Sequence, residues 1–360
     1  MRTTVRVGLA SGLALCSALG CHSAAIDDGP PAVGEGISVS VGPDSRTFVE
    51  LATPSVVEAQ AHGGSIDWDL ALQGHDIFTN GGTSGPGNAS AFGPLSAPTY
   101  LSDTAPDVPL LLKDRAGGAL LDWYYYGGAT HQLFSRFHVY ALRDGERLFK
   151  LQILSYYGEQ SGAEVSALYH VRYAEVTAAG TAEVHDVTDI DATAGGSKDD
   201  DSQPSGCLEL DTERVSALTP AEAASSDNWQ LCFRRDFISV NGGLSGPRGM
   251  EAVDLQAAAT LDETEAEIEN RTADSEQPLF DAQDLPALTD SALVYRADGV
   301  VTAFGQRWLE PGSQPLAVSS SVWLVIGADG ASKYLVRFSD LRGDPAVERA
   351  TLRLEAKAVQ

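Results

Sequence analysis

The residue patterns that support covalent catalysis do not occur in this sequence of 360 residues. Neither of its glycine-rich segments has the Gly-x-Ser-x-Gly spacing that exposes a nucleophilic serine, and there is no His-Glu-x-x-His zinc motif. Cys207 and Cys232 have no neighbouring histidine that would activate a thiol. Acidic residues are spread along the whole chain, so no pair stands out as a general acid and base. We therefore predict that the protein is not an enzyme and has no catalytic residues.

Two glycine-rich segments invite comparison with phosphate-binding loops, GGTSGPG from Gly81 and GGLSGP from Gly242. A phosphate loop leads into a helix whose N-terminal amides face the anion, and it usually carries a Lys-Ser or Lys-Thr pair. Here Pro86 and Gly87 end the first segment, and Asn-Ala-Ser-Ala follows it. We interpret both segments as tight loops between strands, in which glycine supplies positive φ angles.

The N-terminus has the features of a bacterial lipoprotein signal. Arg2 and Arg6 precede an apolar run over residues 7–19, and Gly20-Cys21 follows. Small residues before a cysteine at this point resemble a lipobox, in which the cysteine is acylated and becomes the new N-terminus. We predict a signal peptide over residues 1–21, lipidation at Cys21, and a lipid-anchored protein at the outer membrane or cell surface. The alternative is ordinary secretion with cleavage near residue 24 or 25.

Export also bears on the two cysteines in the second half of the chain. An oxidising compartment permits a disulfide between Cys207 and Cys232. Each lies in a β-patterned run, CLEL or LCF, and neighbouring strands would bring the two within bridging distance. We predict this disulfide, and the alternative is a pair of buried thiols.

The net charge restricts the partners of the chain. Lys and Arg number 24 against 50 Asp and Glu, which gives a formal net charge of −26. Such a surface repels nucleic-acid phosphates and anionic lipid headgroups, and it disfavours acidic substrates. We expect no nucleic-acid partner. We also expect no transmembrane segment, because no apolar run after the signal approaches 18 residues.

Two stretches rich in glycine, serine, proline and aspartate divide the chain. Residues 22–45 are predicted to be a flexible tether. Residues 192–203 are predicted to be an acidic linker, because the ligand spacing of a calcium loop is missing. These boundaries and the chain length predict two domains, over residues 46–191 and 204–360.

The two predicted domains are internally related. DWDLAL from Asp67 and the following IFTNGGTSGP correspond to NWQLCF from Asn228 and ISVNGGLSGP. The register holds without a gap from the tryptophan to the proline. Farther on, residues 139–140 match residues 322–323, and an Asp-Gly turn follows each pair. We interpret the chain as two tandem copies of one module.

Short runs of β-branched and aromatic residues predict strands over residues 137–142, 149–154, 168–173, 321–326, 334–338 and 350–356. The pairs Asp144-Gly145 and Asp329-Gly330 lie between such runs and predict hairpins. Helix is expected only in short pieces, over residues 220–224 and 261–269. The predicted fold class is therefore all-β, mostly antiparallel, with few short helices.

The first copy resembles the HmuY family of haem-binding outer-membrane lipoproteins. The resemblance rests on residues 66–87, 123–133 and 148–173, which contain WDLA, TNGGTSGPG, an aromatic cluster with Thr-His, and FKLQILSYY. The second copy keeps Trp229 and the glycine-rich loop but has WLEP from Trp308 in place of the aromatic cluster. The resemblance implies two tandem HmuY-like β domains, of which the second is degenerate.

The family implies that one haem is held non-covalently between two axial side chains and serves haem and iron acquisition. It implies a haem or haemoprotein donor and an outer-membrane haem transporter as partners. Members of the family use His or Met as axial ligands. Met250 is the one methionine left after removal of the signal, so histidine supplies the candidates here.

Three histidines are the axial candidates. His131 follows the aromatic cluster, where the haem-facing hairpin of the family would fall, and its alternative role is that of an exposed hairpin residue. His138 begins one predicted strand and His170 lies in another, and each is otherwise a solvent-facing strand residue. No histidine follows His185, so one haem is expected, in the first domain.

Aromatic and basic residues near these histidines complete the predicted site. Trp123, Tyr124 and Tyr126 are candidates to flank the porphyrin, or else they pack in the core. Arg172 is a candidate partner for a haem propionate, or else it forms a cross-strand ion pair. Further positive charge in the first domain comes from Arg136 and Arg143. The competing prediction is a non-catalytic envelope interaction or structural protein on the same β scaffold that has lost haem binding.

Overall fold

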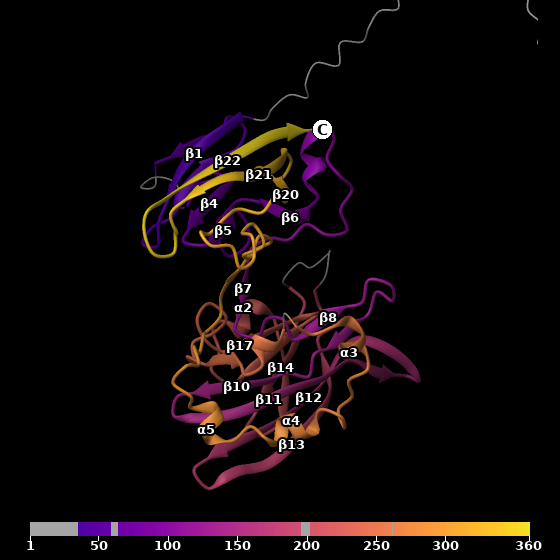
Figure 1. The fold of residues 1–360 in the computed structure, drawn as a ribbon. Helices are drawn as coiled ribbons and strands as arrows, with labels where there is room; N and C mark the ends of the chain where they lie inside the picture. The colour runs from indigo at the N-terminus through magenta and orange to yellow at the C-terminus, as the bar shows by residue number, and fades with distance from the viewer. Residues whose placement is uncertain (1–34, 59–63, 196–201, 261) are drawn as a thin grey trace, which may run out of the picture. The chain divides into compact units, whose positions relative to one another are not determined.

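Antiparallel β-sheet forms most of the computed structural model, which confirms the predicted fold class (Figure 1). The structure describes residues 35–58, 64–195, 202–260 and 262–360. The predicted signal peptide, the predicted lipidation site Cys21 and residues 22–34 of the predicted tether lie outside the described residues. Within the described part of the chain, no helix is long and apolar enough to cross a membrane.

One five-stranded antiparallel sheet joins strands from both ends of the described chain. Its order is β1-β22-β21-β20-β6, with the bounds β1 Glu35–Val41, β22 Ala350–Val359, β21 Lys333–Arg342, β20 Val322–Ile326 and β6 Ser90–Leu95. β1 lies within residues 22–45, where the sequence predicted a flexible tether. It is ordered in the sheet because Val39 and Val41 alternate into the core and because its whole length pairs with β22.

A four-stranded sheet contributes to the same core. Its order is β3-β2-β4-β5, with the bounds β3 Ser55–Val57, β2 Thr47–Glu50, β4 Leu70–Gln73 and β5 Asp76–Thr79. Val49, Leu70 and Ile77 from this sheet are fully buried in one cluster with Trp323 and Leu354 of the five-stranded sheet. Burial of these apolar side chains is the main force that holds the two sheets together.

A second pair of sheets encloses a second core. The five-stranded sheet has the order β13-β12-β11-β10-β18, with the bounds β13 Gly180–Asp191, β12 Ala163–Thr177, β11 Arg147–Gln160, β10 Val139–Asp144 and β18 Glu251–Asp254. The four-stranded sheet has the order β15-β14-β16-β17, with the bounds β15 Arg214–Leu218, β14 Ser205–Glu209, β16 Leu231–Arg234 and β17 Phe237–Val240. Alternation along β12 turns Tyr169, Val171 and Tyr173 into this core, against Phe233 of the four-stranded sheet.

Short helices cover the outer face of the second five-stranded sheet. α4 (Gln277–Asp281) and α5 (Leu285–Leu288) place Phe280 and Leu288 against this face. The buried Lys150 of β11 donates from Nζ to the carbonyl oxygens of Phe280 and Gln283, at 2.9 and 3.1 Å. Because a buried ammonium needs acceptors, these bonds fix the position of the helical segment.

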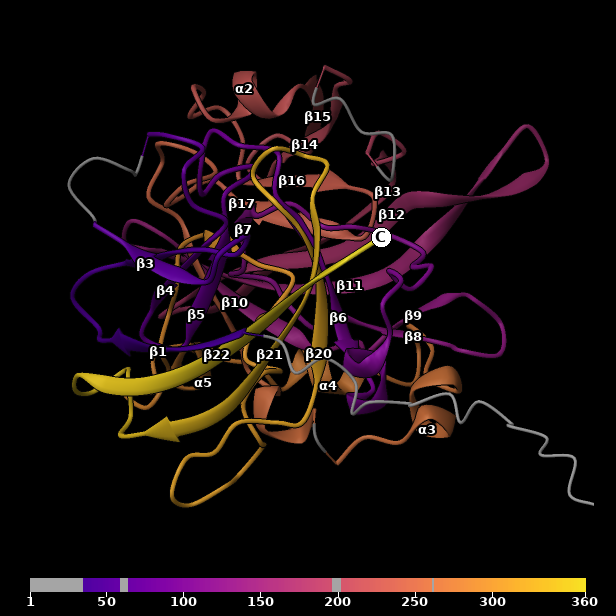
Figure 2. The ribbon, with the colours of Figure 1, turned by 90° about the horizontal axis from the view of Figure 1, so that it is seen from above.

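The remaining elements are short. They are the 3-10 helices η1 (Ala97–Leu101) and η2 (Ala257–Ala259), the helices α2 (Pro220–Ala223) and α3 (Glu265–Glu269), and the ribbons of β7 (Arg115–Gly117) with β19 (Gly299–Val301) and of β8 (Tyr124–Tyr126) with β9 (Leu133–Ser135). α3 begins later than the predicted 261–269, because Thr264 and Glu267 form a capping box that starts the helix at Glu265. Figure 2 shows α3 beside the β8–β9 hairpin, with which it is in contact.

The two glycine-rich loops are held by matching hydrogen bonds. We call residues 80–87 the first NGG loop and residues 241–248 the second. In the first loop, the Asn80 side chain donates to the Trp68 carbonyl at 2.8 Å. In the second loop, Asn241 donates to the Trp229 carbonyl at the same distance. The equivalent geometry agrees with the predicted role of both segments as strand-connecting loops.

The hydrogen-bonded sheets do not follow the predicted domains 46–191 and 204–360. β6 lies in the first of these segments but pairs with β20 of the second. β18 lies in the second segment but pairs with β10 of the first. β6 and β18 occupy equivalent positions after the two NGG loops, and β10 and β20 each precede an Asp-Gly pair. Each five-stranded sheet therefore combines a strand from the first part of one segment with strands from the last part of the other, whereas each four-stranded sheet lies within one segment.

Candidate functional site

The β8–β9 hairpin carries the most accessible of the predicted ligands. Its loop is closed by a hydrogen bond from the His131 amide to the Gly127 carbonyl at 2.7 Å, and His131 has a φ of 57°. The His131 ring is exposed, and its Nδ1 lies 2.8 Å from Oη of Tyr126, whose side chain is 50% exposed. The hairpin therefore presents an imidazole and a phenol as a hydrogen-bonded pair at the surface.

Trp123 and Tyr124 lie deeper than Tyr126. Trp123 is buried, packs against Tyr156 and Tyr169, and donates from Nε1 to the carbonyl of Asp236 at 2.9 Å. Tyr124 donates to the carboxylate of the same aspartate at 2.9 Å. Both rings thus connect the hairpin to the four-stranded sheet. The core role that the sequence left open applies to Trp123, and its ring does not face an open slot.

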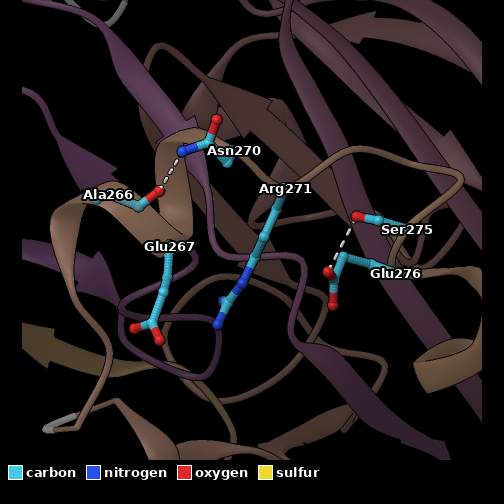
Figure 3. Close-up of a pocket in the computed structure, with 6 residues that line it drawn as sticks. All are labelled: Ala266, Glu267, Asn270, Arg271, Ser275 and Glu276. Atoms are coloured by element: carbon cyan, nitrogen blue, oxygen red, sulfur yellow. Dashed lines mark hydrogen bonds between the residues drawn. The ribbon is translucent and has the colours of Figure 1, made fainter.

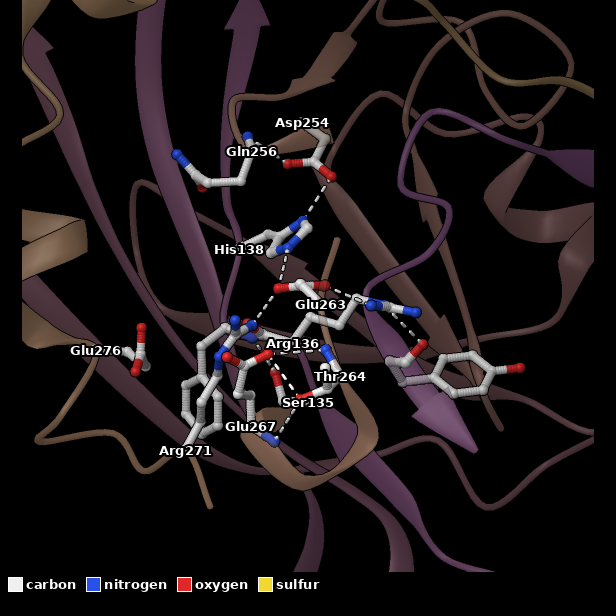
Figure 4. A network of polar contacts seen from close by, with 12 residues as sticks. Ser135, Arg136, His138, Asp254, Gln256, Glu263, Thr264, Glu267, Arg271 and Glu276 are labelled. Atoms are coloured by element: carbon white, nitrogen blue, oxygen red, sulfur yellow. Dashed lines mark hydrogen bonds and ion pairs between the residues drawn. The ribbon is translucent and has the colours of Figure 1, made fainter. Parts of the chain in front are cut away.

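His138 does not have the surroundings of an iron ligand. It precedes β10, is 2% exposed, and lies in the polar network of Figure 4. Its Nδ1 lies 2.7 Å from Asp254 and its Nε2 lies 3.0 Å from Glu263. Because carboxylates engage both ring nitrogens, no lone pair is left for a metal. The prediction that His138 is a solvent-facing strand residue is wrong, because its side chain is buried. The two carboxylate contacts disfavour its predicted role as an axial ligand.

The network around His138 is a buried ion cluster. The Glu263 carboxylate accepts hydrogen bonds from Arg136, Arg271 and His138 (Figure 4). Burial raises the pKa of Glu263, but the hydrogen bonds from these three residues outweigh it and bring that pKa to about 2. Burial lowers the pKa of His138, and the two carboxylates more than compensate, so its pKa is raised. The cluster ties the segment before α3 to β10 and β18.

His170 and Arg172 lie on the same face of β12, as alternation predicted. Both approach Asp186 of β13, with Nε2 of His170 at 3.6 Å and Nε of Arg172 at 3.2 Å from its carboxylate. Arg172 therefore forms the cross-strand ion pair that was the alternative to propionate binding. The His170 side chain is 33% exposed and has no hydrogen-bond partner for Nε2 in the described structure. Its role as a ligand stays a prediction.

The arginines expected to balance haem propionates are engaged elsewhere. Arg136 belongs to the Glu263 cluster. Arg143 forms an ion pair with Glu251 at 3.2 Å, and its guanidinium lies 3.8 Å from the centre of the Tyr295 ring. Both guanidinium groups are therefore already paired with carboxylates of the protein.

A hollow of about 510 Å³ lies beside α3 (Figure 3). Its polar side chains satisfy one another or the helix ends. Asn270 donates to the Ala266 carbonyl, and the Ser275 hydroxyl donates to the Glu276 carboxylate at 3.1 Å. The Glu267 carboxylate accepts a hydrogen bond from the hydroxyl of Thr264, the N-cap residue of α3. The hollow therefore offers no group prepared for a ligand.

The sequence did not single out the acidic partners of His138. Asp254 lies in β18 and Glu263 precedes α3, each more than 110 residues beyond the histidine in the chain. Because the chain has 50 acidic residues, the residue types and sequence positions of Asp254 and Glu263 did not mark them as partners of His138. Only the long-range pairing of β10 with β18 brings Asp254 to this point.

Cys207 and Cys232 form a disulfide between the neighbouring strands β14 and β16. The disulfide lies outside the β8–β9 hairpin and joins the first strand of the predicted second domain, β14, to β16, the strand that follows Trp229.

Within the described residues, no group of three or more His, Cys, Asp and Glu side chains is arranged to hold a metal ion. The exposed imidazole of His131 is a side chain of the type that ligates haem iron.

Among the solved structures that resemble the chain are two whose likeness is weak. No protein-family model matches the chain, and no curated protein matches it. A Bacteroides vulgatus protein described as HmuY-like and heme-binding is 18% identical over 42% of this chain and 83% of its own, with a TM-score of 0.14. The apo HmuY analogue of Tannerella forsythia is 13% identical over 65% of this chain and 88% of its own, with a TM-score of 0.15. At these TM-scores, neither likeness assigns a fold or a function to this chain.

Proposed function

We propose that the chain is an exported, non-catalytic haem-binding protein and that His131 supplies an axial ligand to the haem iron. The observation that carries the proposal is the exposed imidazole on the β8–β9 hairpin, whose Nδ1 is hydrogen-bonded to Tyr126 at 2.8 Å. The motif resemblance to the HmuY family supports haem as the ligand, since His131 falls where that family's haem-facing hairpin is expected.

Tyr126 prepares the imidazole for a metal. A metal-bound histidine generally donates its other N–H to an oxygen, which fixes the tautomer and the ring orientation. In the tautomer whose Nδ1 donates its proton to Oη of Tyr126, Nε2 carries a lone pair that could bind iron. Bound haem would supply an iron centre with vacant axial positions. The protein would supply this nitrogen and hold its ring in place.

The proposed biological role follows from the N-terminal sequence. The chain would be anchored through an acylated Cys21 at the outer membrane or cell surface. There it would take haem from a donor haemoprotein and pass it to an outer-membrane haem transporter. An exposed ligand suits such transfer, because the haem stays accessible to both partners. Incorporation of labelled palmitate by the wild type but not by Cys21→Ser tests the anchor.

The test of haem binding is a hemin titration of the purified, unlipidated chain from His22 onward, followed by the Soret and visible bands. We expect one-to-one binding and a histidine-ligated spectrum that is lost in His131→Ala. His185→Ala, at a histidine of β13 that is not an axial candidate, is the matched control, and it should leave the spectrum unchanged. Unchanged binding in His131→Ala would overturn the assignment of the ligand.

A second candidate function is a non-catalytic interaction or structural protein on the same scaffold. His138, Arg136 and Arg143 form ion pairs with carboxylates of the protein. This observation favours the second function, because a haem site would need such side chains to be free for the haem. Absence of saturable hemin binding in the wild type would leave this function as the one supported.

A further inference from the structure

A second cavity, about 630 Å³ in volume, lies between the segment that leads into β7 and the four-stranded sheet of β14 to β17. None of the candidate haem ligands lines it. Its volume falls in the range of sites for small organic molecules, roughly 300 to 1,000 Å³. We propose that this cavity binds an amphipathic organic anion, with a carboxylate or sulfonate head and an apolar body.

The floor of the cavity is apolar. Trp229 and Ala223 are buried there in one cluster with the Cys207–Cys232 disulfide. Leu218 packs against the same cluster. Such a surface offers hydrogen bonds to few polar groups, so it selects an apolar body.

The mouth of the cavity exposes large apolar side chains. Leu110 is 38% exposed, Leu111 is 37% exposed and Leu244 is 50% exposed. Grouped exposed leucines at the rim of a cavity are typical of a surface that a ligand covers.

The polar part of the lining is basic in an acidic protein. Lys113, Arg115, Arg234 and Arg235 line the cavity, against Asp114 and Asp236 as its acidic residues. Both carboxylates accept hydrogen bonds from protein groups, Asp114 from Thr79 and Asp236 from Tyr124. Among the cations, Lys113 donates to Asn88 and Arg234 to the Gln203 carbonyl, and both keep their positive charge. The formal net charge of the whole chain is −26. A local excess of positive charge in that setting favours an anionic ligand over a neutral or cationic one.

Arg235 is the best-placed partner for the anionic head. Its backbone is fixed by a hydrogen bond from its amide to the Ala192 carbonyl and by one from the Tyr169 hydroxyl to its own carbonyl, both at 2.6 Å. No hydrogen bond or ion pair to its guanidinium is found in the described parts of the chain. A guanidinium binds a carboxylate with two parallel hydrogen bonds, which suits a head group at the rim.

The experiment is a titration of the purified chain from His22 onward with 8-anilinonaphthalene-1-sulfonate, followed by fluorescence. We expect saturable one-to-one binding that is displaced by dodecanoate, for an acyl body, or by 2-naphthoate, for a ring body. The neutral dodecanol should compete at least about tenfold less well, because it lacks the charged head. Equal competition by dodecanol, or no displacement by either acid, would overturn the proposal.

Matched variants locate the site. Ala224 is exposed at the end of α2 and lines the cavity, whereas Ala221 is exposed on the same helix and does not. Ala224→Trp should abolish dye binding, and Ala221→Trp should leave it intact. Arg235→Gln should weaken binding about tenfold, and the exposed Arg342→Gln should not.

The outcome is separable from the haem proposal. Ala224→Trp should keep hemin binding, since His131 is not part of this cavity. A rise in the melting temperature with dodecanoate that is lost in Ala224→Trp provides a readout independent of the dye. Equal dye binding by Ala224→Trp and the wild type, with native circular dichroism in both, would contradict the site.

Discussion

The imidazoles of His131 and His138 have opposite surroundings. His131 is exposed on a hairpin loop and bonded through one nitrogen to a neutral phenol. His138 is buried and bonded through both nitrogens to carboxylates. The first can offer a lone pair to a metal, whereas the second stabilises the fold as part of an ion cluster.

Replacing Tyr126 by phenylalanine tests whether the phenol prepares His131. The ring would stay, but the hydrogen bond to Nδ1 would be lost. We expect hemin affinity to fall about tenfold, the lower end of the effect of removing such an orienting partner. Soret titration measures it. Tyr125→Phe, on the same hairpin, should bind hemin like the wild type, and an equal loss in both variants would argue against a specific role for Tyr126.

Replacing Glu263 by glutamine tests the buried ion cluster. Arg136, Arg271 and His138 would lose their shared carboxylate, so the free energy of unfolding should fall by about 3 kcal/mol. The folded pKa of Glu263, about 2, lies below its ordinary value of 4.5, so its contribution is present at neutral pH and is lost as the pH falls toward 2. Urea unfolding at several pH values measures the difference. The exposed Glu269→Gln is the control, and a difference that persists at pH 2 would contradict this account.

At the scale of elements, two buried carboxylates anchor the segments that lead to the β7–β19 ribbon. Asp114 accepts hydrogen bonds from the amide and hydroxyl of Thr79, both at 2.9 Å. Asp298 accepts from the amides of Ala119 and Val240, both at 3.0 Å. Burial outweighs these hydrogen bonds and raises the pKa of each aspartate to about 6.

This arrangement predicts a pH dependence of stability. The folded pKa of about 6 lies above the ordinary 3.8, so each carboxyl stabilises the fold at acid pH and loses that contribution as the pH rises through 6. The free energy of unfolding of the wild type, relative to Asp298→Asn, should fall by up to about 3 kcal/mol between pH 4 and pH 7. The free energy of unfolding of the wild type relative to Asp114→Asn should show the same fall between pH 4 and pH 7. Parallel pH profiles of wild type and variant would disprove the assignment.

The sequence predicted the elements whose signals are local. The Asp144-Gly145 hairpin joins β10 and β11 where expected, and the capping chemistry of Thr219 starts α2 at Pro220. α4 and α5 were missed because helices of four or five residues carry too little periodicity to recognise. For the site, the position of His131 on a hairpin was expected from the resemblance carried by its neighbouring residues, and the β8–β9 hairpin is found there. The burial of His138 was not, because its partners come from distant parts of the chain.

At the scale of the whole molecule, the sheets combine distant parts of the sequence. β6 pairs with β20, and β18 pairs with β10, so the predicted segments 46–191 and 204–360 each lack part of their own sheet. The described residues accordingly belong to one compact unit, Gly34–Gln360. Internal sequence similarity shows which segments are equivalent, but it cannot show with which partner an equivalent strand pairs.

Cleavage between residues 195 and 202 tests whether the two predicted domains share their five-stranded sheets. A protease site inserted there would separate the two segments covalently. We expect the cleaved halves to co-elute in size-exclusion chromatography and to separate only in denaturant, because shared sheets hold them together. Each half expressed alone should show no cooperative unfolding. A half that unfolds cooperatively by itself would support the independent domains predicted from the sequence.

In the proposed function, one haem binds each chain through His131. Native mass spectrometry of hemin-loaded protein, after removal of excess hemin, measures it most directly. We expect one retained haem per chain for the wild type and for His138→Ala molecules that remain folded, and none for His131→Ala. Equal retention by the wild type and His131→Ala, or no retention by the wild type, would contradict it.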